Sequence, residues 1–280
     1  MNFNQTPAST WSMARAWMTI SLVATLLTGT SALAQDMETI TIPLTRPGKP
    51  AWIEISILSA HIEVIGENRE DVQFDVSVMK GERRIITPSG PKPITTGGYS
   101  LEVEEDDNRV KINTDWRTSR VRVVARVPVN ANLDLSTVND GVIEVDNIRG
   151  ELDLRNVNGP ITATGITGSV IAESVNENIR IELDALTEGN AVALTSVNGD
   201  LSVGLPAKTG AEIHIDTARG EIYSDFEVEV VPTKPMVDRK REGRGVKVKV
   251  ESVITAKVAG GGPVIKLKTL NGDIQLAETP

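Results

Sequence analysis

Short runs of alternating apolar and polar residues fill the chain after its first 34 or so residues, and turn-forming residues separate them. A period of two places successive side chains on opposite faces of a β-strand. Ahead of a repetitive second half, the candidate strands are residues 53–57, 61–65, 72–79, 99–104, 109–113 and 120–127. No amphipathic helical period is found after residue 34. The pattern therefore predicts an all-β fold.

A ten-residue pattern occurs six times in the second half of the chain. The copies are LDLSTVNDGV from Leu133, LDLRNVNGPI from Leu152, VIAESVNENI from Val170, VALTSVNGDL from Val192, IHIDTARGEI from Ile213 and IKLKTLNGDI from Ile265. The first five start 18 to 22 residues apart, and the sixth starts 52 residues after the fifth. A fixed period of this length is typical of repeat architectures in which one unit stacks on the next.

Each copy ends in a turn. Its first and third positions are apolar and predict a core-facing side, its fifth is small and polar, and its sixth is apolar. The seventh is Asn in five of the six copies, and in three of these Gly follows the Asn. Asn tolerates left-handed backbone angles, and Gly turns without steric cost. We predict structural corners at Asn139, Asn158, Gly159, Asn176, Asn198, Gly199, Gly220, Asn271 and Gly272. A looser second corner is expected near Gly150, Gly168, Gly189 and Gly210.

Two architectures fit units of two strands and two corners. The first is a β-solenoid, similar to a right-handed β-helix, in which equivalent residues stack about 4.8 Å apart and the Asn side chains form a ladder. The alternative is an antiparallel β-meander or sandwich with Asn-Gly hairpins. The likeness of equivalent positions favours the solenoid. Because Glu177 replaces Gly in one corner and Arg219 replaces Asn in another, the continuity of the ladder stays open.

Three segments are expected along the chain. Residues 1–34 hold one charge, Arg15, then an apolar run and small residues ending at Ala34, which predicts a signal peptide. Residues 35–127 are expected to form a β-rich N-terminal cap, and residues 128–280 the repeats, with a β-hairpin insertion at about 226–260. We therefore expect an exported protein, either periplasmic or at the cell surface or extracellular, with no transmembrane segment in the mature chain.

Composition removes several classes of function. The chain has no Cys, which excludes disulfides, thiol catalysis and zinc–thiolate sites. A formal net charge of −9 opposes binding to nucleic acid, and no nucleic-acid partner is expected. One segment has the opposite charge, and we predict it as an interaction tip of the hairpin insertion; its basic residues are Lys234, Arg239, Lys240, Arg241 and Arg244.

Candidate chemistry is sparse. No nucleotide-binding, serine-hydrolase or zinc-protease motif is present, and the two His residues, His61 and His214, are expected to have structural roles. We expect no catalytic residue, no cofactor and no metal site. The strongest catalytic alternative pairs Asp134 with Asp153, which occupy equivalent positions in adjacent copies and would lie close enough to cleave a glycosidic bond. The acidic run at residues 102–107 is either a weak Ca²⁺ site or a solvated hairpin tip.

A family resemblance rests on these motifs. The Val127-Pro128 step, the run LDLST at residues 133–137 and the corners at Asn158, Asn198 and Asn271 resemble the bacterial "putative adhesin" family, a domain of unknown function in exported and surface proteins. The resemblance covers roughly residues 53–276 and implies a right-handed β-solenoid-like fold without an established catalytic site.

Together these features predict an exported cell-envelope protein, a non-catalytic structural or interaction module whose partner is an envelope or surface polymer or protein. The alternative is a polysaccharide-active enzyme of the envelope built on a β-helix scaffold. The two differ in one respect that a structure can examine, namely whether carboxylates gather in a cleft or lie on a flat face.

Overall fold

The computed structural model describes residues 38–79, 101–114, 120–232, 236–242, 245–251 and 253–279. They belong to a compact unit that spans Gln35–Pro280. The described residues form 23 β-strands and no helix, which confirms the all-β prediction. Within this described part of the chain, no helix has the length and apolar character that a membrane crossing requires.

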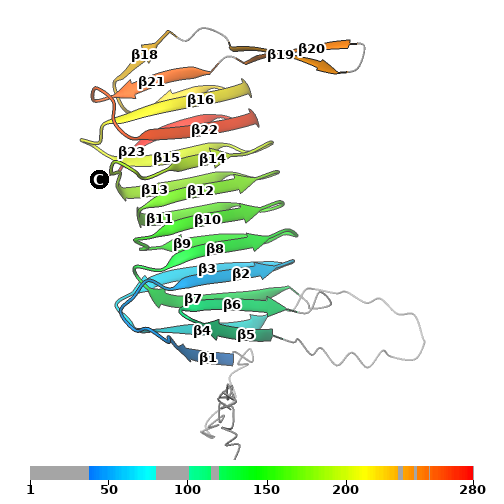
Figure 1. Cartoon of the computed structure of the whole chain (residues 1–280), viewed down its shortest axis with the longest axis vertical. Coiled ribbons are helices and arrows are strands. Elements are labelled where there is room, and N and C mark those ends of the chain that lie inside the picture. Colours follow the sequence, from blue (N-terminus) through cyan, green and yellow to red (C-terminus); the bar gives the residue numbers. More distant parts are fainter. Residues whose placement is uncertain are drawn as a thin grey trace, which may run out of the picture. The chain divides into compact units, whose positions relative to one another are not determined.

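Two large mixed sheets contain all but two of the strands (Figure 1). The ten-stranded sheet contains, in spatial order, β1 (Glu38–Pro43), β4 (Asp71–Val78), β7 (Val121–Pro128), β3 (Ala60–Glu67), β9 (Val142–Asp146), β11 (Ile161–Thr167), β13 (Ile179–Ala185), β15 (Leu201–Pro206), β23 (Ile274–Thr279) and β17 (Ile222–Ser224). The eleven-stranded sheet contains β18 (Val228–Val231), β21 (Ile254–Val258), β16 (Ala211–Arg219), β22 (Val264–Asn271), β14 (Val192–Thr195), β12 (Ser169–Ser174), β10 (Glu151–Asn156), β8 (Asn132–Thr137), β2 (Trp52–Ile57), β6 (Arg109–Thr114) and β5 (Leu101–Asp106). A separate hairpin consists of β19 (Met236–Glu242) and β20 (Gly245–Glu251).

Within the repeats the chain passes from one sheet to the other at every corner. β8 lies in the eleven-stranded sheet, β9 in the ten-stranded sheet, β10 in the eleven-stranded sheet again, and this alternation continues to β15. Each strand pairs in parallel with the equivalent strand of the neighbouring unit, so that Leu152 faces both Leu133 and Val170. The two facing sheets resemble the two layers of the sandwich alternative. Within the repeats, however, neighbouring strands of one sheet run parallel, and consecutive strands of the chain lie in opposite sheets.

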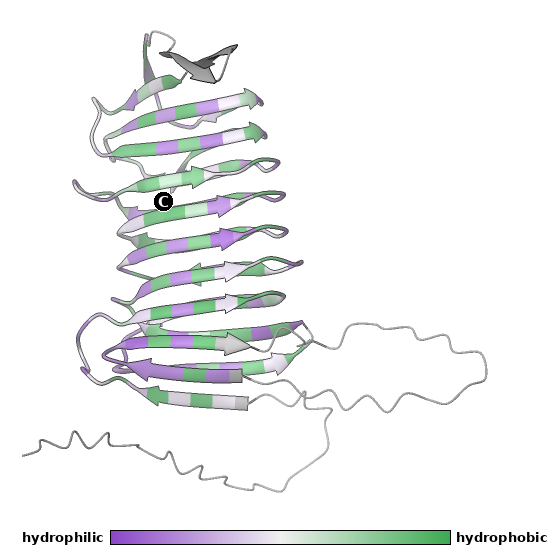
Figure 2. Cartoon of the chain, turned by 45° about the vertical axis from the view of Figure 1, so that its right-hand side comes forward, coloured by the Kyte–Doolittle hydropathy of each residue, from purple (hydrophilic) through white to green (hydrophobic). Residues whose placement is uncertain are grey.

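The core lies between the two sheets and forms one continuous cluster of buried apolar side chains. Strand residues alternate in hydropathy along their length, as the bands in Figure 2 show. Leu133 and Leu154 from one sheet and Ile143 and Ile161 from the other have no exposed surface. Each such side chain contributes about 1.5 to 3 kcal/mol by burial. Stability therefore accumulates unit by unit, as in other repeat folds.

The N-terminal segment joins the repeats without a break. β2 pairs in parallel with β8, and Ile53 faces Leu133; β3 pairs in parallel with β9, and Ile62 faces Ile143. The six strands predicted in this segment are present, with ends shifted by two residues at most, and residues 99 and 100 of the fourth lie outside the described residues. β1 was not predicted, and it pairs antiparallel with β4 at the edge of the ten-stranded sheet.

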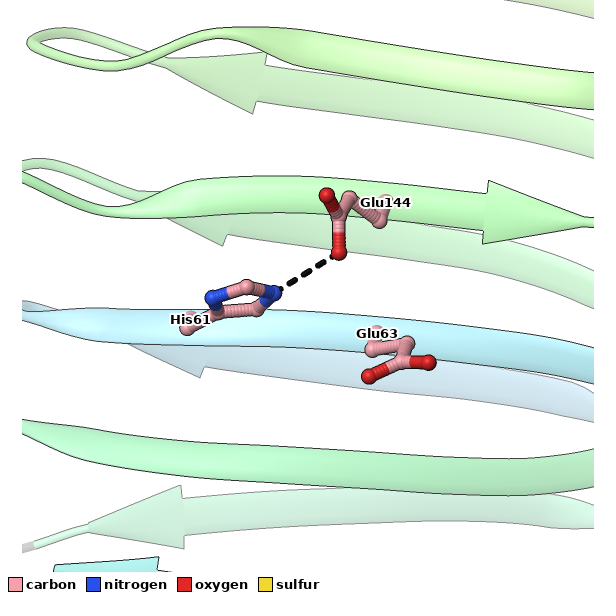
Figure 3. A group of neighbouring side chains, drawn as sticks. All are labelled: His61, Glu63 and Glu144. Carbon is pink, nitrogen blue, oxygen red and sulfur yellow. Dashed lines mark hydrogen bonds and ion pairs between the residues drawn. The ribbon is translucent and has the colours of Figure 1, made fainter. Parts of the chain in front are cut away.

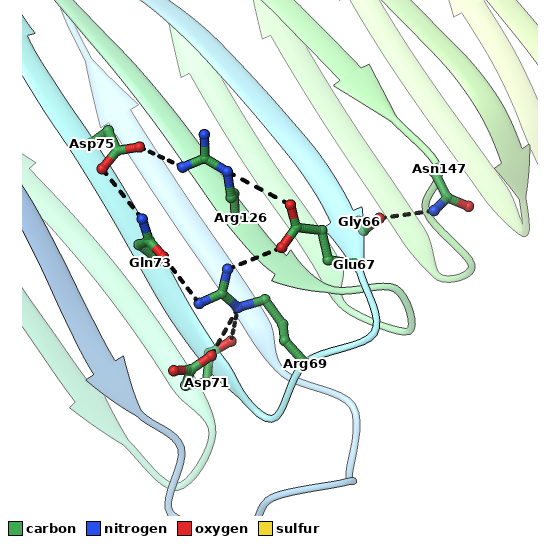
Figure 4. A network of polar contacts seen from close by, with 8 residues as sticks. All are labelled: Gly66, Glu67, Arg69, Asp71, Gln73, Asp75, Arg126 and Asn147. Carbon is green, nitrogen blue, oxygen red and sulfur yellow. Dashed lines mark hydrogen bonds and ion pairs between the residues drawn. The ribbon is translucent and has the colours of Figure 1, made fainter.

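A network of charged side chains covers the outer face of β3, β4 and β7 (Figure 4). Arg126 contacts Asp75 and also Glu67, the latter at 3.6 Å. Arg69 contacts Glu67 at 3.2 Å and Asp71 at 2.8 Å. These ion pairs connect the antiparallel strand β4 to the parallel pair β3 and β7, where the direction of pairing changes.

The sequence order and the spatial order of the repeats differ at one place. β22, which carries the sixth copy, lies between β14 and β16, so Ile265 faces Val192 on one side and Ile213 on the other. β23 lies likewise between β15 and β17. The position beyond β16 is occupied by β21 and β18, which pair antiparallel. The last unit is therefore inserted into the stack, which the 52-residue step does not predict.

The insertion between the fifth and sixth copies contains two antiparallel pairs and not one hairpin. β18 pairs with β21, and β19 pairs with β20. The β-hairpin expected at about 226–260 is thus replaced by two pairs whose strands have different partners. Of the predicted basic tip, Lys234 and Arg244 lie outside the described residues, and for β19 only the backbone of Arg239, Lys240 and Arg241 is described.

Candidate functional site

The Asn-Gly corners gather along one edge of the stack, where strands of the eleven-stranded sheet end. The side-chain amide of Asn176 donates to Oδ1 of Asn158 at 2.7 Å, that of Asn198 to Asn176 at 3.0 Å, and that of Asn271 to Asn198 at 2.8 Å. Asn158 in turn donates to the carbonyl of Val138 at 3.0 Å. We call Asn158, Asn176, Asn198 and Asn271 the asparagine ladder. It follows the spatial order of the units and passes through the inserted last one.

The ladder ends at the two remaining corners. At one end Asn139 takes part through its backbone, whose N–H donates to the carbonyl of Leu58 at 2.8 Å. At the other end Arg219 faces Asn271 and supplies a carbonyl to the N–H of Gly272 at 3.1 Å. Glu177 replaces Gly inside the ladder without interrupting it, since the neighbouring Asn176 bonds on both sides.

The corner glycines are needed because the units approach closely there. A Cβ on Gly159 would lie 1.6 Å from the carbonyl oxygen of Gly141, and one on Gly199 would lie 2.0 Å from that of Glu177. Both glycines have ordinary negative φ, since neither is among the positive-φ residues. Glycine is thus required at these corners by close backbone packing, and not by the turning freedom that the sequence predicts. Two further predicted corners are packed in the same way, Gly220 and Gly272.

Next to the ladder runs a row of exposed aliphatic side chains. The exposed fractions are 38% for Val138, 37% for Val175, 37% for Val197 and 50% for Leu270, and Leu58 continues the row with 48%. We call these five residues the apolar ridge. Asn158, Asn198 and Asn271 donate their backbone N–H to the ridge residues Val138, Val175 and Val197 of the neighbouring units. Asn176 donates to Val157, which has the equivalent position but is less exposed and is not part of the ridge. The sequence identified this column as apolar but did not predict its exposure.

The paired carboxylates of the catalytic alternative are neighbours on an outer face. Asp134 and Asp153 are register partners on β8 and β10. Arg155 contacts both, at 3.4 Å for Asp134. Burial raises the pKa of Asp134, and the charges of Asp153 and Glu54 act in the same direction, while Arg155 opposes them. Arg155 therefore ties both acids, whose side chains are half-buried, into one ion-paired cluster.

The acidic run at residues 102–107 is bound to a neighbouring loop. The carboxylate of Glu105 accepts hydrogen bonds from the N–H and the hydroxyl of Thr45, at 3.1 and 2.9 Å, and from the N–H of Asn108 at 2.9 Å. Asn108 accepts a further bond from the N–H of Arg46 at 2.6 Å. These contacts give the run a structural role in closing the β5–β6 turn.

A hollow beside this turn is lined by Trp52, whose aromatic ring offers a face on which a sugar could stack. The guanidinium of Arg109 lies 5.3 Å from the centroid of its ring. A cation over the ring face is a favourable contact in itself. It also occupies the surface on which a sugar would stack.

The ladder predicts a measurable contribution to stability. Asn176 is both donor and acceptor in it, so Asn176→Ala removes two hydrogen bonds. We expect a loss of about 1 kcal/mol in the free energy of unfolding, because net contributions of exposed hydrogen bonds are modest. Urea unfolding measures it. Asn139→Ala is the matched control, because the described contacts of Asn139 run through its backbone; an equal loss in both variants would contradict a role of the ladder.

Asp134 and Asp75 are expected to contribute to the free energy of unfolding with opposite dependences on pH. Burial raises the pKa of Asp134, so its stabilising contribution is present in acid, where it is protonated, and is lost as the pH rises through the raised value. For Asp75, burial acts to raise the pKa, but hydrogen bonds from Thr39, Arg126 and Gln73 outweigh it and lower the value. Its contribution is present near neutral pH and is lost in acid.

Unfolding in urea at neutral and acidic pH therefore separates two variants. Asp134→Asn is expected to unfold at higher urea concentration than the wild type at neutral pH, with the gain fading in acid. Asp75→Asn is expected to unfold at lower urea concentration at neutral pH, with the deficit fading in acid. The same sign of change for both variants at neutral pH would contradict the assignment.

Comparison with known proteins gives a likeness at low identity. No family model matches the chain, and no curated protein matches it. Among solved structures, a putative cell adhesion protein from Clostridium sporogenes is 11% identical, with 87% of this chain and 99% of that chain covered and a TM-score of 0.43. A putative adhesin from Bacteroides fragilis is 12% identical, with 88% and 98% covered and a TM-score of 0.34. A putative adhesin from Parabacteroides merdae is 8% identical, with 87% and 96% covered and a TM-score of 0.30.

Proposed function

We propose that this protein is a non-catalytic interaction module of the cell envelope, built as a β-solenoid that presents its corner edge to a partner. The observation that carries the proposal is the apolar ridge beside the asparagine ladder. Five of the six aliphatic side chains at this position are exposed in successive units, and only Val157, between Val138 and Val175, is less exposed; neighbouring strands lie about 4.8 Å apart. Contiguous exposed apolar surface on a folded chain commonly marks an interaction site.

The form of this surface favours an extended partner. The ridge runs across successive units, which backbone hydrogen bonds at the corners join one to the next. The ladder amides beside it supply a parallel row of polar groups. A narrow apolar row with a polar margin fits a polymer or an extended peptide segment of the envelope better than it fits a compact ligand, which needs a concave pocket.

The solenoid form of the proposal is supported by the pairings inside the repeats. Units joined across the two sheets stack in parallel, with like residues on like. Its non-catalytic character is supported by the ion pairs that Asp134 and Asp153 make with Arg155. Export is supported by the leader-like composition of residues 1–34, which lie outside the described residues.

The test is a binding assay on isolated envelope material, with cell-wall polymer and membrane fractions offered separately. Val175→Ser, Val197→Ser and Leu270→Ser are combined, which makes the ridge polar without touching the core. We expect binding of the wild type to persist at high salt, because apolar contacts are not screened, and binding of the triple variant to fall by roughly tenfold or more, or about 1.4 kcal/mol.

Ile171→Ser is the matched control. Ile171 is a comparably exposed apolar residue, at 43%, but it lies on the outer face of β12 away from the ridge. Equal loss in the control and in the triple variant, or no binding of the wild type to either fraction, would contradict the proposal. Release of sugar fragments from the cell-wall polymer by the wild type would instead support the enzyme alternative.

A further inference from the structure

Three side chains with metal-binding atoms meet on the outer face of the ten-stranded sheet. His61 and Glu63 are two residues apart on β3 and therefore point to the same side. Glu144 on β9 is the direct register partner of Glu63. One nitrogen of His61 and one carboxylate oxygen from each glutamate all lie within 4.8 Å of one another. Figure 3 shows the Glu144 carboxylate reaching from β9 to His61 on β3, with Glu63 beside them on the same strand.

The donor set suits a divalent transition-metal ion. Zinc binds imidazole nitrogen and carboxylate oxygen at about 2.0 to 2.2 Å and needs three or four such donors. Imidazole favours zinc and its neighbours in the first transition row over calcium or magnesium, which prefer oxygen alone. The side chains are partly open to solvent, with exposed fractions of 19% for His61 and 47% for Glu144, so an ion has access and small rotations can close the donors around it.

The present contacts show how the two carboxylates are held near each other. Like charges directly opposite on neighbouring strands are destabilising. Nε2 of His61 contacts a carboxylate oxygen of Glu144 at 2.8 Å, and Arg122 from β7 forms an ion pair with Glu63 at 2.6 Å. A cation between the glutamates would replace the first contact with coordination and would compete with the second. Arg122 can move aside, since 45% of its side chain is exposed.

The second histidine of the chain lacks this arrangement. His214 also contacts a glutamate two residues away, Glu212, at 2.8 Å. Its register partners are Thr255 and Lys266, and those of Glu212 are Lys257 and Val264. Lysines in place of a second carboxylate disfavour a cation. The chain thus contains two similar His–Glu pairs, of which one has a third donor on the adjacent strand.

We propose that His61, Glu63 and Glu144 form a binding site for a zinc-type divalent metal ion. The ion joins β3 of the N-terminal segment to β9 of the first repeat, which are paired in space but about 80 residues apart in the chain. Because the ion binds where the two strands are paired, it stabilises the folded state by mass action. The three ligands leave a coordination position for water or for a group from a partner.

The test begins with the full chain after treatment with a chelator. We expect isothermal titration with Zn²⁺ to show one ion per chain and a rise in the melting temperature, and titration with Co²⁺ to produce visible absorption bands of a nitrogen- and oxygen-ligated ion. In an NMR titration with Zn²⁺, the imidazole signals of His61 are expected to shift while those of His214 stay in place.

Variants identify the ligands. Glu63→Gln and Glu144→Gln are each expected to weaken Zn²⁺ binding by roughly tenfold or more, because a neutral amide is a poor ligand. Arg122→Gln is expected to strengthen it, and His214→Ala to leave it unchanged. Melting temperatures without metal show whether each variant is folded. The proposal is overturned if the wild type binds no Zn²⁺ at about 1 mM, because binding with a dissociation constant above this concentration is too weak to matter. It is also overturned if binding survives both glutamate substitutions, or if it is lost with His214→Ala.

Discussion

Leu194→Asp is expected to unfold the repeats, whereas the same change one residue earlier, Ala193→Asp, is expected to leave them folded. Leu194 has no exposed surface on β14. Truncating such a side chain costs about 2 to 5 kcal/mol, and an unpaired carboxylate in the same place adds several kcal/mol more or is forced to take up a proton. The sum is comparable to the whole stability of a domain, about 5 to 15 kcal/mol.

The neighbouring position differs only in the face it occupies. Ala193 points outward and its register partner is Lys266, so a new carboxylate there gains a nearby cation. We expect its melting temperature to change little, because exposed ion pairs contribute at most about 1 kcal/mol. Circular dichroism during thermal unfolding measures both variants. Similar melting temperatures for the two would contradict the alternation of faces on which the core depends.

Much of this fold can be predicted from the sequence because the local signals agree with each other. The alternation of residues 120–127 and of every repeat copy predicts the strands, and equivalence of the copies predicts which residues are neighbours. The equivalence of Leu133, Leu152 and Val170 in the sequence becomes direct register in space. Because each position recurs in every copy, the pairing of equivalent positions is enough to predict most contacts between neighbouring units.

The same equivalence explains why the order of the units cannot be predicted. Every copy offers apolar residues at the same two positions, so any copy can pair with any other in the same register. Ile265 fits equally beside Val192 and beside Ile213, and it has both as partners. Position along the chain carries no information about which of these pairs forms. The insertion of the last unit between the fourth and fifth therefore cannot be predicted from the repeat copies alone.

The candidate sites were hidden for two further physical reasons. The period-two rule assigns faces only within a strand, and Val175 and Val197 lie just where a strand ends, so their exposure does not follow from alternation. The proposed metal ligands come from β3 and β9, whose pairing has no repeat motif on the β3 side. His61 and Glu63 are recognisable as a pair from their spacing, but their third partner is not.

Ending the chain after Gly262 is expected to disrupt the strands on both sides of the inserted unit. This truncation removes β22 and β23, with Ile265, Leu267, Ile274 and Leu276, whose exposed fractions are 0 to 1%. At about 1.5 to 3 kcal/mol for each buried aliphatic side chain, roughly 6 to 12 kcal/mol of burial is lost. The truncation then leaves unpaired edges on the strands that had paired with β22 and β23, which are β14 and β15 on one side and β16 and β17 on the other.

Hydrogen exchange locates the effect, because repeat folds depend on nearest-neighbour contacts and open locally. We expect amides of β14 to β17 to lose protection and amides of β8 to β11, which do not pair with the lost strands, to keep it. Replacing β19 and β20 by a flexible linker is the control, since these strands pair only with each other among the described residues. Retained protection in β14 and β16 would mean that they pair directly, as their common register with Ile265 allows, and would contradict the expected need for the inserted unit.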